Sequence, residues 1–514
     1  MFTQTLASLT SQPEFYLKLL GQHLLISLVA ITAASVLGLV IGILIAEFKK
    51  TSSIALALIN IIYTVPSISL LGLLIPLSGI GNTTAVIALT IYALLPMVRN
   101  TFIGIDTIDE RIIEAARGMG STKLQILRKI KLPLALPVIV AGFRNMVVMT
   151  VALAGIASFI GAGGLGVAIY RGITTNNMAM TIAGSLLIAV LAFAMDALVG
   201  VLSRLIESRK EHLRRIGVVA LIALLGLGVL GVASRWWMDR SNEGDVVRLA
   251  TKPMTEQYLI GEMLTLLIED RTDLTVVMTQ GVGGGTSNIM PAMIAGEFDL
   301  YPEYTGTGWN EVLKKEGIYD ETLFDELQRT YAERFDMQWK AMYGFNNTYG
   351  LAVRAEIAQK YQLATYSDLA RVASQLSFGA EYDFFERQDG YRALSEAYGM
   401  VFKSTTDLDI GLKYQAIAQG QVDVINIFTT DGQLSSSGVV VLVDDKGFYP
   451  SYRCGNVVRG DVLARHPELS EVLMELDNAI DDATMARLNF EVEDNKAQPL
   501  GVARAFLTER GLLR

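Results

Sequence analysis

The feature that most constrains this chain is a series of long apolar runs confined to its first half. Up to about residue 237 the sequence consists mostly of such runs. About twenty apolar residues are enough for a helix to cross the hydrocarbon core of a bilayer. The sequence therefore predicts an all-α polytopic membrane domain over residues 1–237. Its six transmembrane helices are expected near 22–47, 53–77, 83–104, 133–160, 178–206 and 216–236.

The composition agrees with a membrane-embedded half and excludes several kinds of protein. Of 514 residues, 51% are hydrophobic and 18% are charged, which is too apolar for an ordinary soluble enzyme. The net charge of -9 argues against a nucleic-acid partner. The three histidines and the single Cys454 are scattered, so no metal site is expected. We expect no cleavable signal, because about twenty mixed residues precede the first apolar run.

The connections between the apolar runs differ in their lysine and arginine content. Those after the first, third and fifth runs are rich in these residues, whereas those after the second and fourth hold only Arg171. Loops rich in Lys and Arg face the cytoplasm. The sequence therefore predicts an extracytoplasmic N-terminus. With an even number of spans, everything from Met238 onward is also expected outside.

The basic loop near 106–133 contains Glu114-Ala-Ala-Arg-Gly-Met-Gly120, followed by Ile130-Lys-Leu-Pro133. Thr107 and Glu110 match a capping box, so a helix is expected to begin there, and Gly120 can help to end it. A second helix can start at Ser121, or at Thr122 with Gln125. The apolar residues of the first helix share one side of it, which therefore needs a partner surface: Ile108, Ile112, Ala115, Ala116 and Met119.

The spacing Glu-Ala-Ala-x3-Gly-x9-Ile-x-Leu-Pro resembles the cytoplasmic coupling loop of binding-protein-dependent ABC transport permeases. The resemblance implies a membrane domain of the ABC importer permease type. It also implies that Glu114, Ala115, Ala116 and Gly120 couple the chain to a separate cytoplasmic ABC ATPase subunit. ATP and Mg would be bound by that partner, because this chain has no Walker A sequence and is expected to carry no cofactor. The alternative is an ordinary solvated loop helix.

Two features inside the apolar half have competing interpretations. Arg144 and Asp196 fall at membrane depth, where they can form a structural pair between helices or face the interior of the bundle or water. Gly161-Ala-Gly-Gly-Leu-Gly166 spells G-x-G-x-x-G but follows a predicted span rather than a strand. We therefore expect close helix packing or a re-entrant turn, not a dinucleotide site. The sequence of this segment resembles that of osmoprotectant and methionine permeases.

The pattern changes after a short linker at 238–245. From there to residue 514, short β-branched segments alternate with amphipathic ones, which predicts α/β lobes with mostly parallel sheets. We expect lobe 1 at about 246–348 and 453–514, and lobe 2 at about 349–452, with a cleft between them. The expected strands are 246–250, 274–279, 350–353, 376–379, 422–427 and 439–443, and a single helix is expected over 469–488.

Several segments of this second half occur in the same order as in a known family. They are Thr251–Gln257, Asp299–Thr307, Asn346–Ala352, Glu386–Tyr391, Thr429–Gly432 and Asp444–Tyr452. The sequence resembles extracytoplasmic binding proteins for quaternary ammonium osmoprotectants: glycine betaine, choline, carnitine and proline betaine. The resemblance implies a two-lobed domain of the periplasmic-binding-protein type.

The family pattern places aromatic rings at Tyr304, Tyr349 and Tyr452, with a fourth at Phe428. A quaternary ammonium has no N–H to donate, so aromatic faces are suited to hold it. The family often has Tyr at the fourth position, and Phe keeps the π face while losing the hydroxyl. This departure leaves the ligand's identity open. The ordinary alternative for each tyrosine is a place in the core or at its rim.

A zwitterionic ligand also carries a carboxylate, for which the matching positions offer Lys252, Thr307 and Arg387. Arginine can hold a carboxylate with two parallel hydrogen bonds. Backbone N–H groups near 283–287 can add to an anion pocket. The ordinary alternatives are a solvated cap for Lys252 and a surface ion pair for Arg387. Three acidic residues near the cleft are expected to be structural hydrogen-bonding groups: Asp299, Glu303 and Asp431.

Together the resemblances imply a fused permease and substrate-binding protein of an ABC importer of the osmoprotectant uptake family. It would lie in the bacterial cytoplasmic membrane and act with an ABC ATPase. Two copies are expected to pair, since one set of spans supplies half of the pathway usual in the family. One alternative ligand is ergothioneine or another betaine-like compound. A different class is a ligand-gated receptor or channel with an outer clamp domain. No catalytic set stands out, so an enzyme is not expected.

Overall fold

The computed structural model describes residues 2–175, 177–208, 210–241, 245–317, 319–387, 390–410, 412–449 and 451–513. The chain divides into two compact units. One comprises Met1–Ile169 and Ile182–Glu243, and the other comprises Tyr170–Thr181 and Gly244–Arg514. Within the predicted linker, residues 242–244 lie outside the described part.

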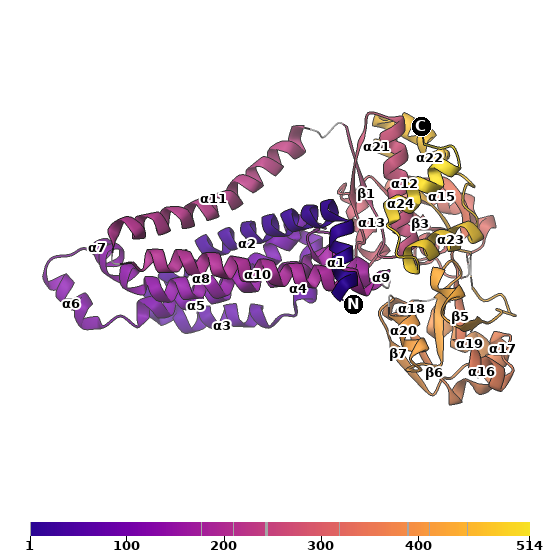
Figure 1. Cartoon of the computed structure of the whole chain (residues 1–514), viewed down its shortest axis with the longest axis horizontal. Coiled ribbons are helices and arrows are strands. Elements are labelled where there is room, and N and C mark those ends of the chain that lie inside the picture. The colour runs from indigo at the N-terminus through magenta and orange to yellow at the C-terminus, as the bar shows by residue number, and fades with distance from the viewer. Residues whose placement is uncertain are drawn as a thin grey trace. The chain divides into compact units, whose positions relative to one another are not determined.

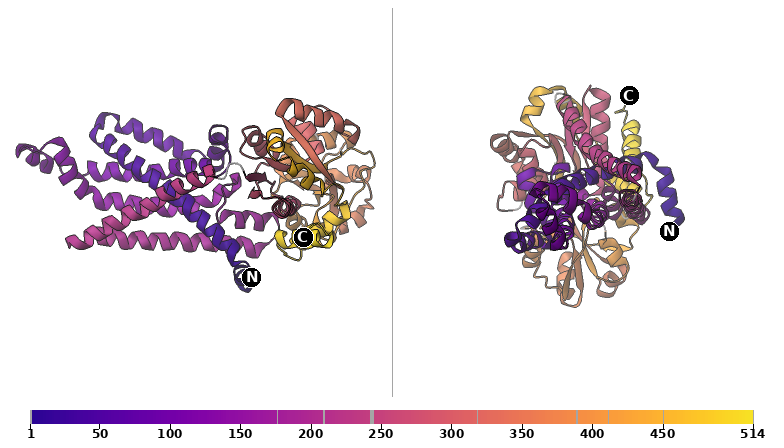
Figure 2. Two further views of the ribbon diagram at one scale, coloured as in Figure 1. Left: turned by 90° about the horizontal axis from the view of Figure 1, so that it is seen from above. Right: turned by 90° about the vertical axis from the view of Figure 1, so that its left-hand side faces the viewer.

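The first part of the chain is helical, and its long helices run alongside one another (Figures 1 and 2). The helices are α1 (Phe2–Ser11), α2 (Pro13–Glu47), α3 (Lys49–Thr64), α4 (Ser67–Ser78), α5 (Asn82–Asp106), α6 (Glu110–Gly118), α7 (Lys123–Ile126), η1 (Leu127–Lys131), α8 (Leu132–Leu153), η2 (Ala154–Ile160), α9 (Gly166–Thr174), α10 (Met178–Ile206) and α11 (Glu211–Ser241).

Four helical stretches are long and apolar enough to cross a membrane: Pro13–Glu47, Asn82–Asp106, Lys123–Ile160 and Met178–Ile206. A fifth results if Ser52–Thr64 and Ser67–Ile75, which meet at 93°, form one broken span. The bend follows from Pro66, which keeps the preceding Val65 in an extended conformation. The described residues thus give four or five spans rather than the predicted six. The predicted run at 216–236 falls in α11, where the side chains of 229–241 lie outside the described part.

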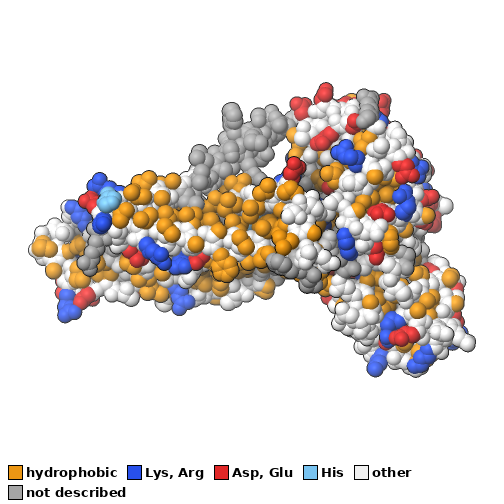
Figure 3. Space-filling model, in the orientation of Figure 1, with side chains coloured by type: hydrophobic (Ala, Val, Ile, Leu, Met, Phe, Trp, Pro, Cys, Tyr) orange, Lys and Arg blue, Asp and Glu red, His pale blue; other side chains and the backbone are white. Residues whose placement is uncertain are grey.

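Small residues allow these helices to approach closely. α2 packs mainly on α5, and α5 packs on α8. A Cβ atom added to Gly42 would lie 2.5 Å from the Thr101 Cβ, and one added to Gly142 would lie 2.4 Å from the Asn100 Cβ. Small residues at such crossings are typical of helix packing in membranes. Figure 3 shows hydrophobic side chains covering the visible face of these helices, as a lipid-facing surface requires.

The structure shows how Arg144 and Asp196 contact each other. The guanidinium of Arg144 on α8 makes two hydrogen bonds to the Asp196 carboxylate on α10. The interpretation as a structural pair between helices is confirmed. The Gly161–Gly166 segment lies between η2 and α9, with no strand beside it among the described residues. The segment therefore connects two helices and does not follow a strand, as the sequence predicted.

The basic loop forms the two expected short helices, but one of its caps differs from the prediction. α6 begins after Asp109, whose carboxylate accepts a hydrogen bond from the Arg111 backbone N–H. Thr107 instead ends α5 and donates its hydroxyl proton to the Ile103 carbonyl, so the predicted Thr107–Glu110 capping box is wrong. A carboxylate at the cap also suits the positive end of the helix dipole. The second cap, Thr122 with Gln125, is confirmed.

The second part of the chain contains two five-stranded sheets. The first has the order β2-β1-β3-β10-β4, and the second has the order β7-β6-β8-β5-β9. The strands are β1 (Val246–Ala250), β2 (Thr275–Thr279), β3 (Leu300–Tyr304), β4 (Met337–Asn346), β5 (Tyr349–Arg354), β6 (Ser377–Ala380), β7 (Ser404–Asp407), β8 (Val424–Phe428), β9 (Val439–Val441) and β10 (Arg453–Arg459). The first sheet therefore draws on both ends of this part and the second on its middle.

Helices cover these sheets and bury their apolar faces in a shared core (Figure 1). The longer helices are α12 (Thr255–Arg271), α13 (Thr286–Ile294), α15 (Phe324–Phe335), α16 (Ala355–Tyr361), α17 (Tyr366–Val372), α19 (Tyr391–Tyr398), α22 (Glu468–Met474), α23 (Asp482–Glu493) and α24 (Pro499–Glu509). Shorter helical segments are α14 (Thr305–Thr307), η3 (Gly308–Val312), η4 (Glu321–Leu323), η5 (Ala373–Gln375), α18 (Tyr382–Glu386), α20 (Lys413–Ala418), η6 (Gly432–Ser435) and α21 (Gly460–Arg465).

The α/β alternation is confirmed, but the expectation of mostly parallel sheets is wrong. β1 pairs in parallel with β2 and β3, whereas β10 runs antiparallel to β3 and β4. In the second sheet β6 pairs in parallel with β7 and β8, and β5 runs antiparallel to β8 and β9. The antiparallel strands β5 and β10 begin just after the chain passes from one sheet to the other. The single helix expected over 469–488 is broken, since α22 ends at Met474 and α23 starts after the Asp481 cap.

Candidate functional site

Three of the four predicted rings come together where the chain crosses between the sheets. Tyr349 on β5 and Phe428 on β8 are direct partners in the antiparallel register, and their ring centroids lie 5.0 Å apart. Tyr452, just before β10, meets Tyr349 edge-on at 5.9 Å. Phe384 and Tyr449 pack on Tyr349 at 5.0 Å and 5.8 Å. We call Tyr349, Phe428 and Tyr452 the aromatic cluster.

Arg387 lies across this cluster. Its Cζ is 5.8 Å from the Tyr349 ring centroid and 5.7 Å from that of Tyr452, and its Nη2 donates to the Tyr452 hydroxyl over 3.1 Å. Its Nη1 is 3.2 Å from the Glu311 Oε2. The guanidinium therefore shows that these ring faces accept a cation. Next to Arg387, residues 388 and 389 lie outside the described part, as does residue 450 near Tyr452.

The fourth predicted ring, Tyr304, lies at the end of β3 with a cation of its own. The Lys252 Nζ is 4.7 Å from the Tyr304 ring centroid and forms a buried ion pair with Glu303. In the β3–β10 register Tyr304 faces Cys454, two residues after Tyr452. Tyr304 therefore contacts Lys252, and it lies on β3, which pairs with the β10 strand that follows Tyr452. The involvement of Glu303 in an ion pair agrees with the structural role expected for it.

Thr307 lies in α14, directly after Tyr304, and its side chain is buried. The neighbouring Gly306 packs against the Tyr452 ring, since an added Cβ would lie 2.6 Å from a ring carbon. Only glycine permits this approach, which brings the Tyr304–Thr307 segment against the cluster. Asp299, by contrast, lies directly before β3 and pairs with Arg248 on β1, in agreement with its expected structural role.

A buried carboxylate that the sequence did not single out connects four of the segments that resemble the binding-protein family, its own and three others. Glu256 accepts hydrogen bonds from the Tyr304 hydroxyl, from the Asn347 Nδ2 at 2.6 Å and from the Thr430 Oγ1 at 2.6 Å. Burial raises the pKa of Glu256, and these three donors oppose the rise. Its position within Thr251–Gln257, which resembles the binding-protein family, could have indicated a role at the site. A single Glu at the start of a helix is usually solvated, however, so this signal is weak.

Lys413 was also missed, and no motif marked it. Its Nζ lies 4.5 Å from the Phe428 ring centroid, 3.4 Å from the Asp431 Oδ2 and 4.0 Å from the Glu381 Oε2. Asp431 also accepts hydrogen bonds from the Tyr414 hydroxyl and the Phe428 backbone N–H. Asp431 therefore positions both the lysine and the strand that carries the ring, in agreement with its expected structural role.

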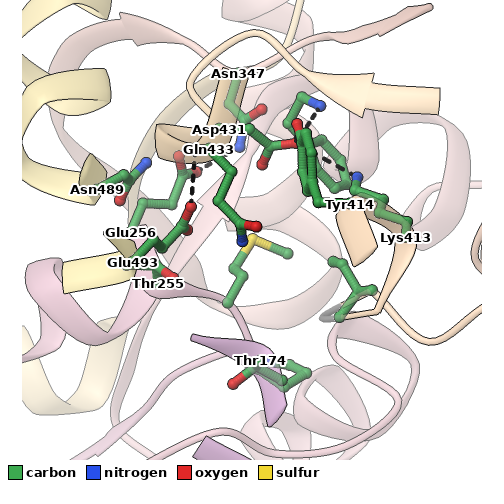
Figure 4. A pocket seen from close by; sticks show the side chains of 14 residues that line it. Thr174, Thr255, Glu256, Asn347, Lys413, Tyr414, Asp431, Gln433, Asn489 and Glu493 are labelled. Atoms are coloured by element: carbon green, nitrogen blue, oxygen red, sulfur yellow. Dashed lines mark hydrogen bonds and ion pairs between the residues drawn. The ribbon is translucent and has the colours of Figure 1, made fainter. Parts of the chain in front are cut away.

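A polar pocket adjoins Phe428 at this lysine (Figure 4). Burial, together with the nearby charge of Asp431, raises the pKa of Glu493 to about 8. Glu493 therefore carries a proton over much of the neutral range. We define the polar pocket by six of its lining residues: Glu256, Asn347, Lys413, Asp431, Asn489 and Glu493.

The rings and charged side chains of this region can contact a small ligand. No group of three or more His, Cys, Asp or Glu residues in the described part is arranged to hold a metal ion. The aromatic cluster and Tyr304 offer electron-rich faces, and each face already lies against a cationic side chain. Such a site favours a ligand that combines a cation with an anionic or electron-rich group, because a bare cation would also meet these three basic residues.

An apolar helical bundle and a two-sheet α/β domain with a buried aromatic site thus occur in one polypeptide. Residues 38–210 match the family "Binding-protein-dependent transport system inner membrane component". Residues 245–509, just over half of the chain, match "Substrate binding domain of ABC-type glycine betaine transport system". The chain therefore belongs to the ABC importers, as an inner-membrane permease fused to a binding domain of the extracytoplasmic type. The family expected from the sequence is confirmed.

Among curated proteins, the chain is 40% identical over 484 residues to the "Ergothioneine transport permease/ergothioneine binding protein EgtU" of Helicobacter pylori (strain G27), which covers 93% of this chain and 87% of that protein. It is 35% identical over 266 residues to the carnitine transport binding protein OpuCC of Listeria monocytogenes, covering 51% of this chain and 86% of that protein. Among solved structures, it is similar to a glycine betaine/carnitine/choline ABC transporter, with 32% identity, a TM-score of 0.46, and coverage of 52% of this chain and 99% of the other.

Proposed function

We propose that this importer captures a small trimethylammonium betaine outside the cell and delivers it to its own membrane domain. The observation that carries the proposal is the convergence of Tyr349, Phe428 and Tyr452 from distant parts of the chain. The guanidinium of Arg387 lies over the rings of Tyr349 and Tyr452. A quaternary ammonium cannot donate a hydrogen bond, so ring faces are its natural partners. Tyr304 would complete the aromatic cage.

The ligand's carboxylate would be held by Arg387, with Lys252 and Thr307 nearby. Arg387 suits this role best, because its planar guanidinium can offer two parallel hydrogen bonds. Its present partners, Glu311 and the Tyr452 hydroxyl, lie at 3.2 Å and 3.1 Å. In this proposal the arginine exchanges the Glu311 contact for the ligand, while the cation takes its place on the rings.

Two classes of ligand are candidates, and each is the ligand named for a relative of this chain. Glycine betaine, choline and carnitine are small and flexible, and the carnitine binding protein from Listeria is a relative over the binding domain. Ergothioneine is a trimethylhistidine with a thione sulfur on its ring. The Helicobacter protein named for ergothioneine is similar over 93% of this chain, including the fusion itself. We therefore propose ergothioneine or a close analogue as the second candidate.

The membrane domain is proposed to have six spans, with both the N-terminus and the binding domain extracytoplasmic. α6 then faces the cytoplasm, where its apolar side presents Ile112 and Met119, which are 46% and 81% exposed. This side would dock on a separate ABC ATPase, which supplies ATP and Mg, and a second copy of the chain would complete the pathway. A short tether keeps the binding domain at an effective concentration on the order of mM.

The coupling role can be tested with the assembled importer. We expect Glu114→Ala and Gly120→Ala to reduce ligand-stimulated ATP hydrolysis about tenfold, the effect of a loss near 1.4 kcal/mol in docking. Gly120 has a φ of +83°, which alanine adopts only with strain. Glu207→Ala, at the end of α10, is the matched control. Unchanged stimulation in both loop variants would refute the coupling role.

The ligand class is tested by calorimetry on the full chain in lipid nanodiscs. The titrants are glycine betaine, choline, carnitine, ergothioneine and a set of amino acids. Micromolar binding of at least one trimethylammonium compound is expected, and it should be weakened by Tyr452→Leu, which keeps apolar bulk but removes the π face. Tyr361→Leu, on α16, is the control. Binding of amino acids alone would refute the cage.

A further inference from the structure

The polar pocket contains three buried polar atoms whose hydrogen-bonding capacity is unused. Within the described part of the chain, no hydrogen-bond partner is present for the Lys413 Nζ, the Asn347 Oδ1 or the Asn489 Oδ1. The Lys413 Nζ makes ion-pair contacts with Asp431 and Glu381, but neither is a hydrogen bond. The three residues are only 1%, 6% and 3% exposed, and all three line the pocket. A buried polar atom without a hydrogen bond costs about 1–3 kcal/mol. Three such atoms in one pocket therefore point to a ligand that satisfies them.

The orientations of the two asparagines are fixed by their other contacts. The Asn347 Nδ2 donates to Glu256 over 2.6 Å, and the Asn489 Nδ2 donates to the Thr430 carbonyl over 2.7 Å. Each amide therefore turns its oxygen, an acceptor, away from these partners. Lysine, in contrast, can only donate. A ligand that satisfies the pocket therefore needs hydrogen-bond donors for the asparagine oxygens and at least one hydrogen-bond acceptor for the Lys413 ammonium.

This requirement discriminates among the proposed ligands. Glycine betaine has no N–H or O–H donor, whereas choline and carnitine each have a single hydroxyl donor for the two asparagine oxygens. An imidazole-2-thione ring has two N–H donors and a thione sulfur that carries partial negative charge. Such a ring matches both halves of the requirement, provided that the ligand's ammonium lies in the neighbouring aromatic cluster.

We propose that the polar pocket beside Phe428 is a second subsite, which binds an N–H-bearing ring with an electron-rich acceptor, and that Lys413 is its specificity-determining residue. The proposal rests on the proposed function, since it assumes a trimethylammonium ligand in the aromatic cluster. The ligand's ammonium lies against Tyr349 and Tyr452, and its ring extends past Phe428. The Lys413 ammonium donates to the acceptor atom, and the Asn347 and Asn489 oxygens accept from the ring N–H groups.

Phe428 has a defined part in this arrangement. The Lys413 ammonium already lies over its ring, so that face is closed to a second cation. A ligand is therefore oriented with its ammonium away from Lys413. Asp431 and Glu381 hold the lysine from behind at 3.4 Å and 4.0 Å. A Lys413 with a purely structural role would also need these two acids. Selectivity between ligands, rather than stability, therefore distinguishes a structural role from a specificity-determining one.

The test uses the full chain in nanodiscs and three ligands of graded chemistry. Ergothioneine has the betaine, two ring N–H groups and the sulfur; trimethylhistidine lacks the sulfur and, in its neutral form, one of the two ring N–H groups; glycine betaine lacks the ring. We expect wild type to bind ergothioneine about tenfold or more tighter than trimethylhistidine, as a charge-assisted hydrogen bond predicts. Lys413→Met should remove most of this preference, while Lys360→Met, on an exposed lysine of α16, should leave it unchanged.

The outcomes separate the subsite from the proposed function. If wild type binds glycine betaine and ergothioneine equally, the proposed function stands and the subsite is refuted. The same holds if Lys413→Met weakens all three ligands by one common factor, which is the signature of a structural role. If no trimethylammonium compound binds wild type, both proposals fail. The wild-type comparison of ergothioneine with trimethylhistidine needs no variant and decides the question even if Lys413→Met does not fold.

Discussion

The aromatic cluster and the polar pocket share Phe428, but the first consists of packed rings and the second contains buried polar atoms without hydrogen bonds. Around Tyr349 the rings pack on one another, and the Tyr452 hydroxyl accepts a hydrogen bond from Arg387. Around Lys413 the side chains are equally buried, but three polar atoms have unused capacity. The comparison teaches that burial alone does not make a binding site. In the proposed site, the aromatic cluster would bind the ligand's cation, and the unsatisfied polar atoms of the pocket would select among ligands that carry this cation.

The largest expected effect concerns the cluster. Tyr349→Leu should weaken the binding of every trimethylammonium ligand about thirtyfold, since a desolvated cation–π contact contributes about 2 kcal/mol. Calorimetric titration of the full chain measures it. Because the ammonium is common to all of these ligands, the ratio of their affinities should stay constant. A change in that ratio would show that cluster and pocket do not act separately.

An intermediate effect concerns the pocket and the pH dependence of stability. The pKa of Glu493 rises from 4.5 to about 8 on folding, so the folded state holds a proton that the unfolded state releases. The contribution of this group to stability is therefore complete below about pH 4.5 and is lost as the pH rises toward 8. Glu493→Gln cannot ionise and should flatten this decline by at least about 1 kcal/mol, given about 1.4 kcal/mol per pKa unit.

Thermal unfolding of the full chain between pH 5 and pH 8 measures this decline. Wild type should lose about 3 °C more than Glu493→Gln over the range, by the usual relation between free energy and melting temperature. Glu471→Gln, at an exposed site on α22, is the matched control. Parallel curves for wild type and Glu493→Gln would mean that Glu493 is already ionised at pH 5, contrary to its burial beside Asp431.

The smallest expected effect is that of Phe428→Tyr, which restores the residue common in the family. The faces of the ring carry the contacts with Tyr349 and Lys413, and the substitution leaves them in place. The affinity for glycine betaine should therefore change by less than about threefold, below 1 kcal/mol. A larger gain would show that the hydroxyl, rather than Lys413, governs which ligand is preferred.

The sequence anticipated those parts of the molecule whose signals are local or repeated. Long apolar runs mark helices of membrane-spanning length, and the motif from Glu114 to Gly120 marks α6. The strands missed, such as β3 and β10, are those in which polar or glycine residues interrupt the β-branched pattern. Leu300-Tyr-Pro-Glu-Tyr304 contains Pro and Glu, yet every residue of it is buried. Its partners compensate for this, because Lys252 pairs with Glu303.

By itself, then, the sequence determined the class of protein, the helical half, the α/β half and the set of candidate rings, because each depends on the order or spacing of residues along the chain. Only the tertiary structure decided which side chains share a pocket. Lys413, Asn347 and Asn489 are separated by many residues and belong to no common motif, yet they line one pocket. Their significance depends on burial and on unmet hydrogen bonds, and both are properties of the folded surroundings rather than of any local segment.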